Sequence, residues 1–534
     1  MKFSSHHFIR ILALCAVICG GAALAAPGDL DTTFAPAGSA SPYAPPGVKR
    51  FVHGPGPQSF MTASTLMADG RIVVASWCGN NSPANMDICV SRLSSSGTID
   101  SSFGGGGVAS VGFSAGINMP AGVTLDAQDN IWVGGYCGGV GCIFKFSPSG
   151  GKYVNVGVNG QIAVTGMADV HSLTTTADNK IVVGGRCPGT GSISYPCVAR
   201  ILTNGAMDPA FNGGAIRRWG DDPFDGGLLQ NGNVPRVWVN NDGRIYAANR
   251  CDIGTSVASP NWRMCLAIVE ANGTLPPIFF PDNSVGYFYY GFFPGSTSQF
   301  LYDMVVQSDG SAVIAGLCQT PSGNAGCMTR IVPGVGVDQS FGNSGTVTSV
   351  LGLSRSYAHG VVLREDGSLI LVQNCVVSNV NFGHNGICLA AFTSSGAASN
   401  QFGSGSGTST RLLDLEAPGA ATLATGWFGA TPGTMRGPGN TLYAHGACQV
   451  SGGAASSCIT RISLAAPSGK RCSADIDGNG SVNATSDGLL LVRSLLGLSG
   501  TAVTAGAVAP GAPRSTWFTV RDYLALQCDL TIAP

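Results

Sequence analysis

The residues best suited to chemistry gather in one short stretch near the end of the sequence, between positions 475 and 487. Oxygen-bearing residues alternate there with other residues: Asp475, Asp477, Asn479, Ser481, Asn483 and Asp487. Calcium prefers about six to eight oxygen ligands, which a loop supplies from alternating positions around a glycine that makes a sharp turn. Gly480 stands at the position of that glycine. The spacing therefore predicts that this loop binds Ca²⁺ as a cofactor.

The end of the loop departs from the ideal spacing. The twelfth position is Ser486, and the carboxylate that should occupy it arrives one residue later, at Asp487. The inserted residue leaves a second interpretation open, namely a turn rich in Asp and Gly that binds no metal. The apolar spacing of residues 487–498 predicts a helix directly after the loop.

Cysteine spacing reveals a repeat. Cys15 and Cys19 lie near the N-terminus, and the other sixteen cysteines fall into neighbouring pairs that we expect to form disulfides. These pairs are Cys78 and Cys89, Cys137 and Cys142, Cys187 and Cys197, Cys251 and Cys265, Cys318 and Cys327, Cys375 and Cys388, Cys448 and Cys458, and Cys472 and Cys528. The spacing varies from pair to pair, which favours disulfides over metal sites.

The first seven pairs share one context. A β-rich run after a turn dipeptide such as Asp69-Gly70 precedes each first cysteine, and another strand-like run follows each second cysteine. One unit is therefore strand, turn, strand, loop, strand, turn and strand. Four strands in each of seven copies predict a mainly β fold, a seven-bladed β-propeller, with a small α-helical unit after it.

A charged pair recurs within the copies. An arginine is followed eight residues later by the aspartate of a D-x-x-F motif in three of them: Arg92 and Asp100, Arg200 and Asp208, and Arg330 and Asp338. The seventh copy has Arg461 but no such motif after it, whereas Asp31 and Phe34 form one near the N-terminus. We therefore predict that the N-terminal segment supplies the outer strand of the seventh blade and places Asp31 beside Arg461. A tail that matches by chance is the alternative.

These repeats resemble the bacterial delta-60 repeat. That repeat begins with a D-G-x-I-x-V turn and strand, continues with a strand that contains arginine, and ends with a G-x-L-D-x-(S/T)-F-G segment. The resemblance covers about residues 27–465, is fullest in copies one, three and five, and implies a propeller without established catalytic residues. The C-terminal loop and helix resemble a dockerin module. That resemblance implies a cohesin-like partner, although residues 514–527 lack the second loop that dockerins usually carry.

Composition and the N-terminus define the expected location. Only 11% of the residues are charged and the net charge is -1, which argues against nucleic acid as a partner. Lys2 and Arg10, the apolar run 11–18 and the Ala23-Leu24-Ala25 site are typical of a signal peptide. We expect a monomer that is secreted, periplasmic or at the cell surface, without a membrane span. Its predicted units are a signal peptide (1–25), a propeller (26–466) and a dockerin-like module (467–534).

Three side chains occupy equivalent places at the entry of a predicted innermost strand. His171 and His359 stand seven residues before a turn aspartate, and Tyr302 holds the same place in the fifth copy. Innermost strands line the axis of a propeller, so these residues are candidates for binding a ligand in the channel. Packing at the rim is the structural alternative.

The sequence thus predicts a binding protein that recognises an extracellular polysaccharide or protein. Its C-terminal module is expected to be a docking device, a cap or a tether to the envelope, stabilised by calcium. The alternatives are an extracellular hydrolase or lyase that uses the channel, and a structural component of the envelope.

Overall fold

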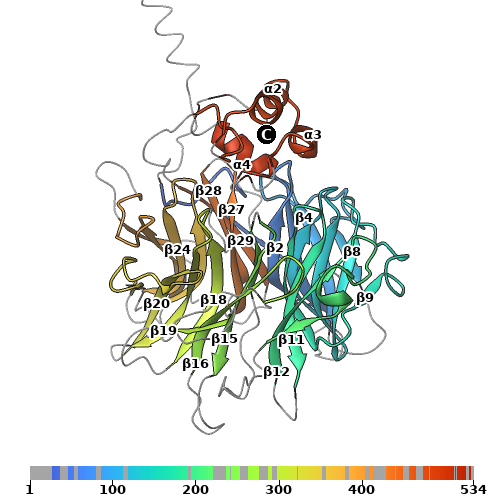
Figure 1. Cartoon of the computed structure of the whole chain (residues 1–534), viewed down its shortest axis with the longest axis horizontal. Coiled ribbons are helices and arrows are strands. Elements are labelled where there is room, and N and C mark those ends of the chain that lie inside the picture. The colour runs from blue at the N-terminus through green and yellow to red at the C-terminus, as the bar shows by residue number, and fades with distance from the viewer. Residues whose placement is uncertain are drawn as a thin grey trace, which may run out of the picture.

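Seven antiparallel sheets surround one axis in the described part of the chain, and a small helical unit lies over one end of the ring (Figure 1). The structure is a computed structural model. It describes residues 27–35, 46–52, 58–79, 86–111, 118–189, 194–219, 236–240, 242–252, 262–275, 287–290, 298–320, 323–351, 356–378, 384–402, 409–413, 429–438, 440–448, 456–464, 473–479, 481–509, 512, 514–524, 528 and 530. The predicted seven-bladed propeller is confirmed.

Each blade begins at the axis and runs outward. Blade one is β2 (Gln58–Leu66), β3 (Ile72–Gly79), β4 (Met86–Leu93) and β5 (Val108–Val111). Blade two is β6 (Asn118–Leu125), β7 (Ile131–Cys137), β8 (Val140–Phe146) and β9 (Gln161–Ala163). Blade three is β10 (Asp169–Thr175), β11 (Ile181–Pro188), β12 (Ser194–Ile201) and β13 (Arg217–Arg218). Blade four is β14 (Arg236–Val239), β15 (Ile245–Asp252), β16 (Trp262–Val269) and β17 (Tyr287–Tyr290).

The remaining blades keep this order. Blade five is β18 (Gln299–Val306), β19 (Ala312–Thr320), β20 (Gly323–Val332) and β22 (Thr346–Ser349), with the short β21 (Gly336–Val337) also paired to β20. Blade six is β23 (Ser356–Leu363), β24 (Leu369–Ser378), β25 (His384–Phe392) and β26 (Thr410–Leu413). Blade seven is β27 (Gly429–Gly437), β28 (Thr441–Cys448), β29 (Ser456–Ser463) and β1 (Val48–Phe51). The first strands of neighbouring blades contact each other all the way round, so they form the inner wall.

The hydrophobic core lies between the blades. Each of seven clusters among the described residues combines side chains of two neighbouring sheets. In the cluster that joins blades seven and one, Phe51 and Tyr443 pack with Met61 and Ile72. Burial of one such side chain contributes roughly 1.5–3 kcal/mol. Each blade therefore depends on both of its neighbours for stability.

The N-terminal segment closes the ring, as the sequence predicts. Strand β1 pairs antiparallel with β29, with Val48 opposite Thr460 and Phe51 opposite Ser457. The D-x-x-F segment is not itself this strand. It precedes β1 and lies along β29 through an isolated β-bridge from Leu30 to Ile462 and backbone hydrogen bonds such as that from Asp31 N–H to the carbonyl of Arg461 (2.9 Å). Pairing the first described strand with the last one removes the free sheet edge that an open ring would expose.

The repeated arginine and aspartate form ion pairs in four blades. Nitrogen–oxygen distances are 2.8 Å for Arg92–Asp100, 2.6 Å for Arg200–Asp208, 2.7 Å for Arg330–Asp338 and 2.8 Å for Arg461–Asp31. The predicted contact between Asp31 and Arg461 is therefore confirmed. We call each unit of arginine, aspartate and phenylalanine a clasp.

Each clasp also reaches the next blade. The guanidinium lies 5.0–5.2 Å from the centre of the phenylalanine ring of the same motif. One of its nitrogens donates to a backbone carbonyl of the following blade, at Pro148, Ala271, Ser394 and Ser95 respectively. In the last case Arg461 of blade seven bonds blade one at 2.7 Å. The four arginines therefore bridge blades as well as pairing within them.

The turn that receives the last clasp requires glycine. Gly97 has φ +81°, and a Cβ there would lie 2.8 Å from the ring of Phe34. The backbone N–H of Ala35 donates to Ser96 in the same turn at 2.8 Å. Glycine thus allows both the left-handed conformation and the close approach of Phe34.

Disulfides join the second and third strands of five blades in the described residues. They are Cys78–Cys89, Cys137–Cys142, Cys187–Cys197, Cys318–Cys327 and Cys375–Cys388. Cys265, Cys458 and Cys528 are also disulfide-bonded, while Cys472 and the side chains of Cys251 and Cys448 lie outside the described part. So many disulfides indicate an extracytoplasmic protein. Within the described residues, no helix is long and apolar enough to cross a membrane. The predicted signal peptide lies outside them.

The C-terminal unit has its own small core. It contains the π-helical turn η5 (Ala484–Gly488) and the helices α2 (Leu489–Leu495), α3 (Thr501–Thr504) and α4 (Trp517–Asp522). Ile476, Leu490, Val503 and Trp517 are buried together. Ala68, from the turn after β2, packs against this cluster. The unit therefore contacts the end of the ring that carries the turns, which we call the turn face; the opposite end, with the disulfide hairpins, is the cysteine face.

We predict that Arg461→Gln lowers stability more than Arg244→Gln, a matched change in an exposed ion pair. The Arg461–Asp31 side chains are 16% and 17% exposed and also bond blade one, so the loss should be about 1–3 kcal/mol. The Arg244 side chain is 39% exposed, and its loss should stay below about 0.5–1 kcal/mol. Urea denaturation measures both. Equal shifts of the midpoint would contradict a role for Arg461 in ring closure.

Acid should weaken the clasps. The hydroxyl of Ser102 and, with it, Arg92 lower the pKa of Asp100 from 3.8 to about 2. A lowered pKa stabilises the folded state fully above pH 3.8, and this stabilisation is lost as the pH falls towards 2. The melting temperature should therefore drop between about pH 4 and pH 2, and Asp100→Asn should flatten that drop. Parallel profiles of the two proteins would show that Asp100 does not contribute.

Candidate functional site

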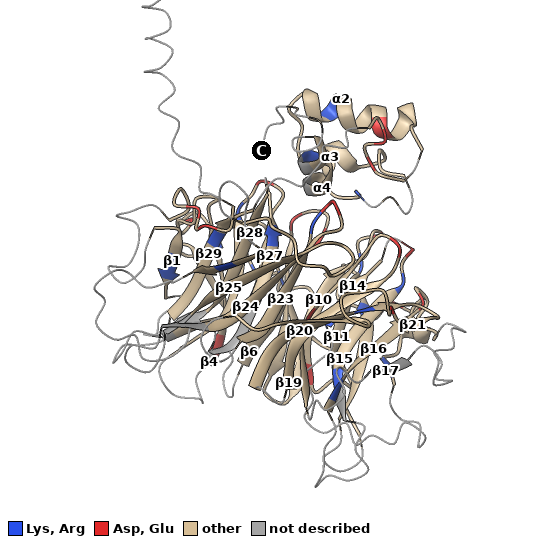
Figure 2. Cartoon of the chain, turned by 90° about the vertical axis from the view of Figure 1, so that its left-hand side faces the viewer, with Lys and Arg blue, Asp and Glu red and all other residues tan. Residues whose placement is uncertain are grey.

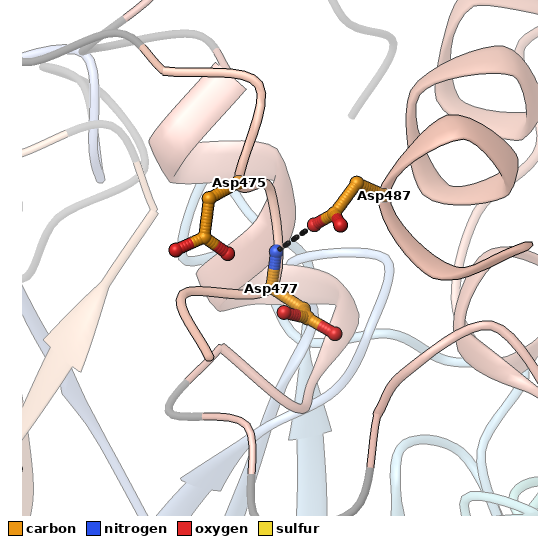
Figure 3. A group of neighbouring side chains, drawn as sticks. All are labelled: Asp475, Asp477 and Asp487. Atoms are coloured by element: carbon orange, nitrogen blue, oxygen red, sulfur yellow. Dashed lines mark hydrogen bonds between the residues drawn. The ribbon is translucent and has the colours of Figure 1, made fainter. Parts of the chain in front are cut away.

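Three carboxylates meet in the C-terminal loop. Asp475, Asp477 and Asp487 offer oxygen atoms that all lie within 4.8 Å of one another, and Asp477 and Asp487 are buried (Figure 3). Like charges at this separation repel each other strongly in a buried setting. Oxygen donors from carboxylates suit a hard divalent cation such as Ca²⁺. The loop can therefore hold a cation that offsets this repulsion.

Asp487 organises the loop from the start of the helical segment. One of its oxygens accepts the backbone N–H groups of Ile476 (2.6 Å) and Asp477 (3.0 Å), and the other accepts that of Asn483 (2.8 Å). Burial alone would raise its pKa, but these N–H groups outweigh burial and lower it. Asp487 thus stays ionised and ties the two ends of the loop together.

The other predicted ligands lie differently. Asn479, Ser481 and Asn483 are exposed. The side-chain oxygen of Asn483 accepts the N–H of Thr485 at 2.9 Å and so caps the helical turn η5. Asn479 makes a similar contact with the N–H of Ser481 at 2.8 Å. The three predicted carboxylate ligands thus lie together, and the backbone N–H of Asn479 donates to Asp475 (3.1 Å) and Asp477 (3.1 Å). Gly480 lies outside the described residues.

Arg514 fixes the loop from behind. Its Nε donates to the carbonyl of Ile476 at 2.6 Å, and Nη2 donates to that of Asp475 at 2.5 Å. The guanidinium stacks on the ring of Tyr523 at 3.8 Å. Arg514 therefore holds the loop through backbone carbonyls. Among the described residues, it forms no ion pair with the carboxylates of the loop.

The helix that follows the loop has an exposed apolar face. Leu489, Val492, Leu495 and Leu496 are 36%, 52%, 56% and 73% exposed. Their spacing of three and four residues places them on one side of α2. Leu490, on the opposite side, is fully buried. We call the four exposed residues the apolar stripe, and contiguous apolar surface of this kind typically marks an interaction site.

The predicted channel residues all lie at β-bulges. The pairing of the innermost strand with its neighbour skips His171 in β10, Tyr302 in β18 and His359 in β23. Thr62 and Ala121 are skipped at the same place in blades one and two. A bulge redirects one side chain away from the regular alternation. His171, Tyr302 and His359 therefore share a spacing from the turn because each is the bulged residue of its innermost strand.

The structure separates these three residues into two groups. Tyr302 and His359 lie side by side, with ring centres 4.8 Å apart. His171 instead contacts Asp169, with Nε2 3.0 Å from Oδ1, and Arg186 donates to the same carboxyl at 2.7 Å. Burial works to raise the pKa of Asp169, but His171 and Arg186 bring it down to about 2. His171 therefore belongs to a separate polar cluster.

Three polar residues beside Tyr302 and His359 escaped the sequence analysis. Arg236 donates from Nε to the carbonyl of Tyr302 at 2.7 Å. Asp303 accepts the N–H of Val361 at 3.0 Å. His445 is 3% exposed, and its Nδ1 lies 2.6 Å from the hydroxyl of Ser64. Together with Tyr302 and His359 they form what we call the axial cluster: Arg236, Tyr302, Asp303, His359 and His445.

Two groups of side chains with aromatic rings lie on the cysteine face, one in blade one and one between blades four and five. Phe60 and Trp77 stack with ring centres 3.8 Å apart and planes 18° from parallel. The guanidinium of Arg250 lies between Trp262 (3.7 Å) and Phe300 (3.9 Å). Trp77 and Arg250 each directly precede the first cysteine of a blade. We call these five residues the aromatic collar, and such surfaces can stack on flat ligand faces.

Two blades match a known family of repeats. Residues 68–103 and 176–211 fit a family model described as a domain of unknown function (DUF5122) beta-propeller. Each match begins beside the turn after the innermost strand and ends on the phenylalanine of a D-x-x-F motif, Phe103 or Phe211. Parts of blades one and three are therefore similar to the DUF5122 beta-propeller family. Both DUF5122 matches lie in the ring, so neither supports the dockerin resemblance of the C-terminal unit.

Several solved structures are similar in fold. A protein of unknown function from Dyadobacter fermentans is 11% identical over 79% of this chain and 100% of its own, with a TM-score of 0.38. A streptogramin B lyase is 12% identical over 61% and 93%, with a TM-score of 0.31. A Bacillus subtilis arabinanase is 12% identical over 54% and 92%, with a TM-score of 0.27. Likeness at this level carries no argument about function. No curated protein matches the sequence.

The loop carboxylates predict a stabilising effect of Ca²⁺. A ligand at about 100 times its Kd should stabilise the C-terminal unit by about 2.7 kcal/mol, seen as slower hydrogen exchange in residues 481–509. Asp475→Asn should lower the affinity for Ca²⁺ at least tenfold, because it removes one of the three negative charges. The protection from exchange at a given Ca²⁺ concentration should fall accordingly. Asp309→Asn, in a turn of the ring, serves as the control. Exchange that does not respond to Ca²⁺ would favour the metal-free turn.

Proposed function

We propose that this protein is an extracytoplasmic binding protein. Its disulfide-stapled propeller is a rigid platform, and its C-terminal unit docks a protein partner through the apolar stripe. The observation that carries this proposal is the exposure of Leu489, Val492, Leu495 and Leu496 on a helix whose other side is buried. Isolated units of this size rarely expose so much apolar surface without a use for it.

The position of the stripe favours docking. Figures 1 and 2 both show α2 on the side of the C-terminal unit away from the ring, with α4 nearer to the ring. A partner could therefore approach α2 without meeting the blades. The partner we propose is a folded protein with an apolar groove, which includes a cohesin-like or envelope protein, since an amphipathic helix docks into such grooves.

Calcium is the proposed cofactor of this docking unit. The three carboxylates of the loop lie directly before α2, and Asp487 connects the loop to the helical segment through backbone hydrogen bonds. A cation there would fix the start of α2 and so order the apolar stripe. This role is structural, and the metal takes no part in chemistry.

The aromatic collar supports a second proposal, that the ring binds an extracellular polysaccharide. The stacked pair Phe60–Trp77 and the sandwich of Arg250 between Trp262 and Phe300 lie on the cysteine face. The C-terminal unit lies on the turn face, so the two surfaces are at opposite ends of the ring. One protein could thus hold a polymer at one end and a protein at the other.

A hydrolase or lyase is less well supported. Such chemistry usually needs two converging carboxylates or a metal near the substrate. In the described residues, the axial cluster contains the single carboxyl of Asp303, and backbone N–H groups occupy both of its oxygens. Binding is therefore the better-supported function.

An envelope pull-down tests the docking proposal. Mature protein should capture one specific protein in Ca²⁺, and Leu496→Glu should reduce capture at least tenfold because a charge cannot enter an apolar groove without a partner. Val158→Glu is the matched control, since Val158 is 77% exposed on the ring. Equal capture by both variants, with unchanged melting curves, would exclude the apolar stripe. Polysaccharide captured by wild type and lost in Trp77→Ala would place polymer recognition on the collar.

A further inference from the structure

Seven equivalent positions form one layer of the inner wall. Each pairs a residue of an innermost strand with one of the second strand: Ala63–Ala75, Gly122–Gly134, Ser172–Gly184, Arg236–Ala248, Asp303–Ala315, Gly360–Val372 and Gly433–His445. Most of these residues are small or apolar. Ser172, Arg236, Asp303 and His445 are the exceptions. Residues that break a local rule of packing are often functional.

Contacts between blades explain only part of these exceptions. Ser172 accepts the N–H of Val237 at 3.0 Å, and Asp303 accepts that of Val361 at 3.0 Å. These two side chains satisfy backbone groups of the next blade, as buried polar groups must. Arg236 also bonds the next blade, through one N–H of its five. A neutral side chain could make that bond, so the charge of Arg236 needs another explanation.

Arg236 forms no ion pair with a carboxylate in the described part of the chain. No described carboxylate lies within 4.0 Å of it, unlike the clasp arginines. The charge of Arg236 acts on Asp303 from beyond ion-pair distance. Both oxygens of Asp303 accept backbone N–H groups, and burial raises the pKa of Asp303. Arg236 is half-buried. A cation with restricted access to water is costly unless an anion pairs with it.

Two neutral imidazoles stand near this cation. Burial, with the charge of Arg236 as a second cause, lowers the pKa of His359 to about 3 and that of His445 also to about 3. Both rings are therefore uncharged at neutral pH. A neutral imidazole still carries one N–H that can donate to an anion. Arg236 is then the single cation of the cluster, and Asp303, whose pKa burial raises, is its single carboxyl.

His445 has an unused nitrogen. Its Nε2 is buried and has no hydrogen-bond partner among the described residues. The ring lies across Gly433 of the innermost strand, where an added Cβ would be 2.2 Å from Nε2. When Ser64 donates to Nδ1, Nε2 carries the proton and is a buried donor that lacks an acceptor. Such donors usually have a partner, which can be a ligand.

We propose that the axial cluster binds the carboxylate group of a small molecule, with Arg236 as the cation and Nε2 of His445 as a hydrogen-bond donor. Arg236 is the single cation of the site, so a ligand with one negative charge fits the cluster better than a doubly charged phosphate. Tyr302 and His359, whose rings lie 4.8 Å apart, border the site. The proposal is independent of the docking function, because it concerns the inner wall of the ring.

Histidine-labelled mature protein tests this proposal by NMR. Acetate should shift the imidazole signals of His359 and His445 in a saturable way, whereas methyl acetate, the neutral counterpart, should not. The signals are assigned with His359→Gln and His445→Gln, and the signal of His171 serves as an internal control. Arg236→Gln should weaken acetate at least tenfold, which is about 1.4 kcal/mol, and Arg236→Lys should weaken it less.

The outcomes separate this proposal from the docking function. No saturable shift in the wild type, or equal affinity in a folded Arg236→Gln variant, would overturn the carboxylate site. Inorganic phosphate that binds more tightly than acetate would overturn the choice of a single charge. Leu496→Glu should bind acetate as the wild type does, so failure of either proposal leaves the other standing.

Discussion

Closure of the ring is the constraint on which the rest of the structure depends. Every blade buries its apolar side chains against its two neighbours, so the first and last blades are stable only if they meet. Strand β1 and the Asp31–Arg461 ion pair join the first and last blades. Arg461 also donates a hydrogen bond across the seam to the carbonyl of Ser95. Because closure fixes all seven innermost strands around one axis, it also brings together the residues of the axial cluster, which lie up to 209 positions apart between Arg236 and His445.

Most of the fold could be predicted because it is repeated. The turn dipeptides, cysteine pairs and β-rich runs recur with each blade, and local turn chemistry largely determines where such strands pair. The closure was predictable for a subtler reason: no aspartate stands eight residues after Arg461, and no arginine stands eight residues before Asp31. What the pattern did not reveal was the bond from each clasp arginine to the next blade, because its acceptors are backbone carbonyls and any residue can supply one.

The candidate sites were predictable only where their residues are close in sequence. The loop carboxylates lie within thirteen positions and were found, but the use of Asn483 as a helix cap was not, since an asparagine can serve as ligand or cap with the same side chain. In the axial cluster, the bulge residues shared a spacing from the turn. Asp303 lies one residue beyond the bulge in β18, Arg236 has the equivalent register position in β14, and His445 lies on the second strand of its blade. Only the strand pairing therefore reveals that these three residues share a layer.

The C-terminal unit and the seam of the ring are physically connected. Ala68, which packs into the core of that unit, belongs to the turn that ends the innermost strand of blade one. Burial raises the pKa of Tyr443 in blade seven, and the charges of Arg461 in the clasp and of Arg521 in α4 both act on it in the opposite direction. The unit therefore lies over the junction that closure creates. A cation that ordered the loop before α2 would therefore stabilise a unit that contacts the seam of the ring through Ala68.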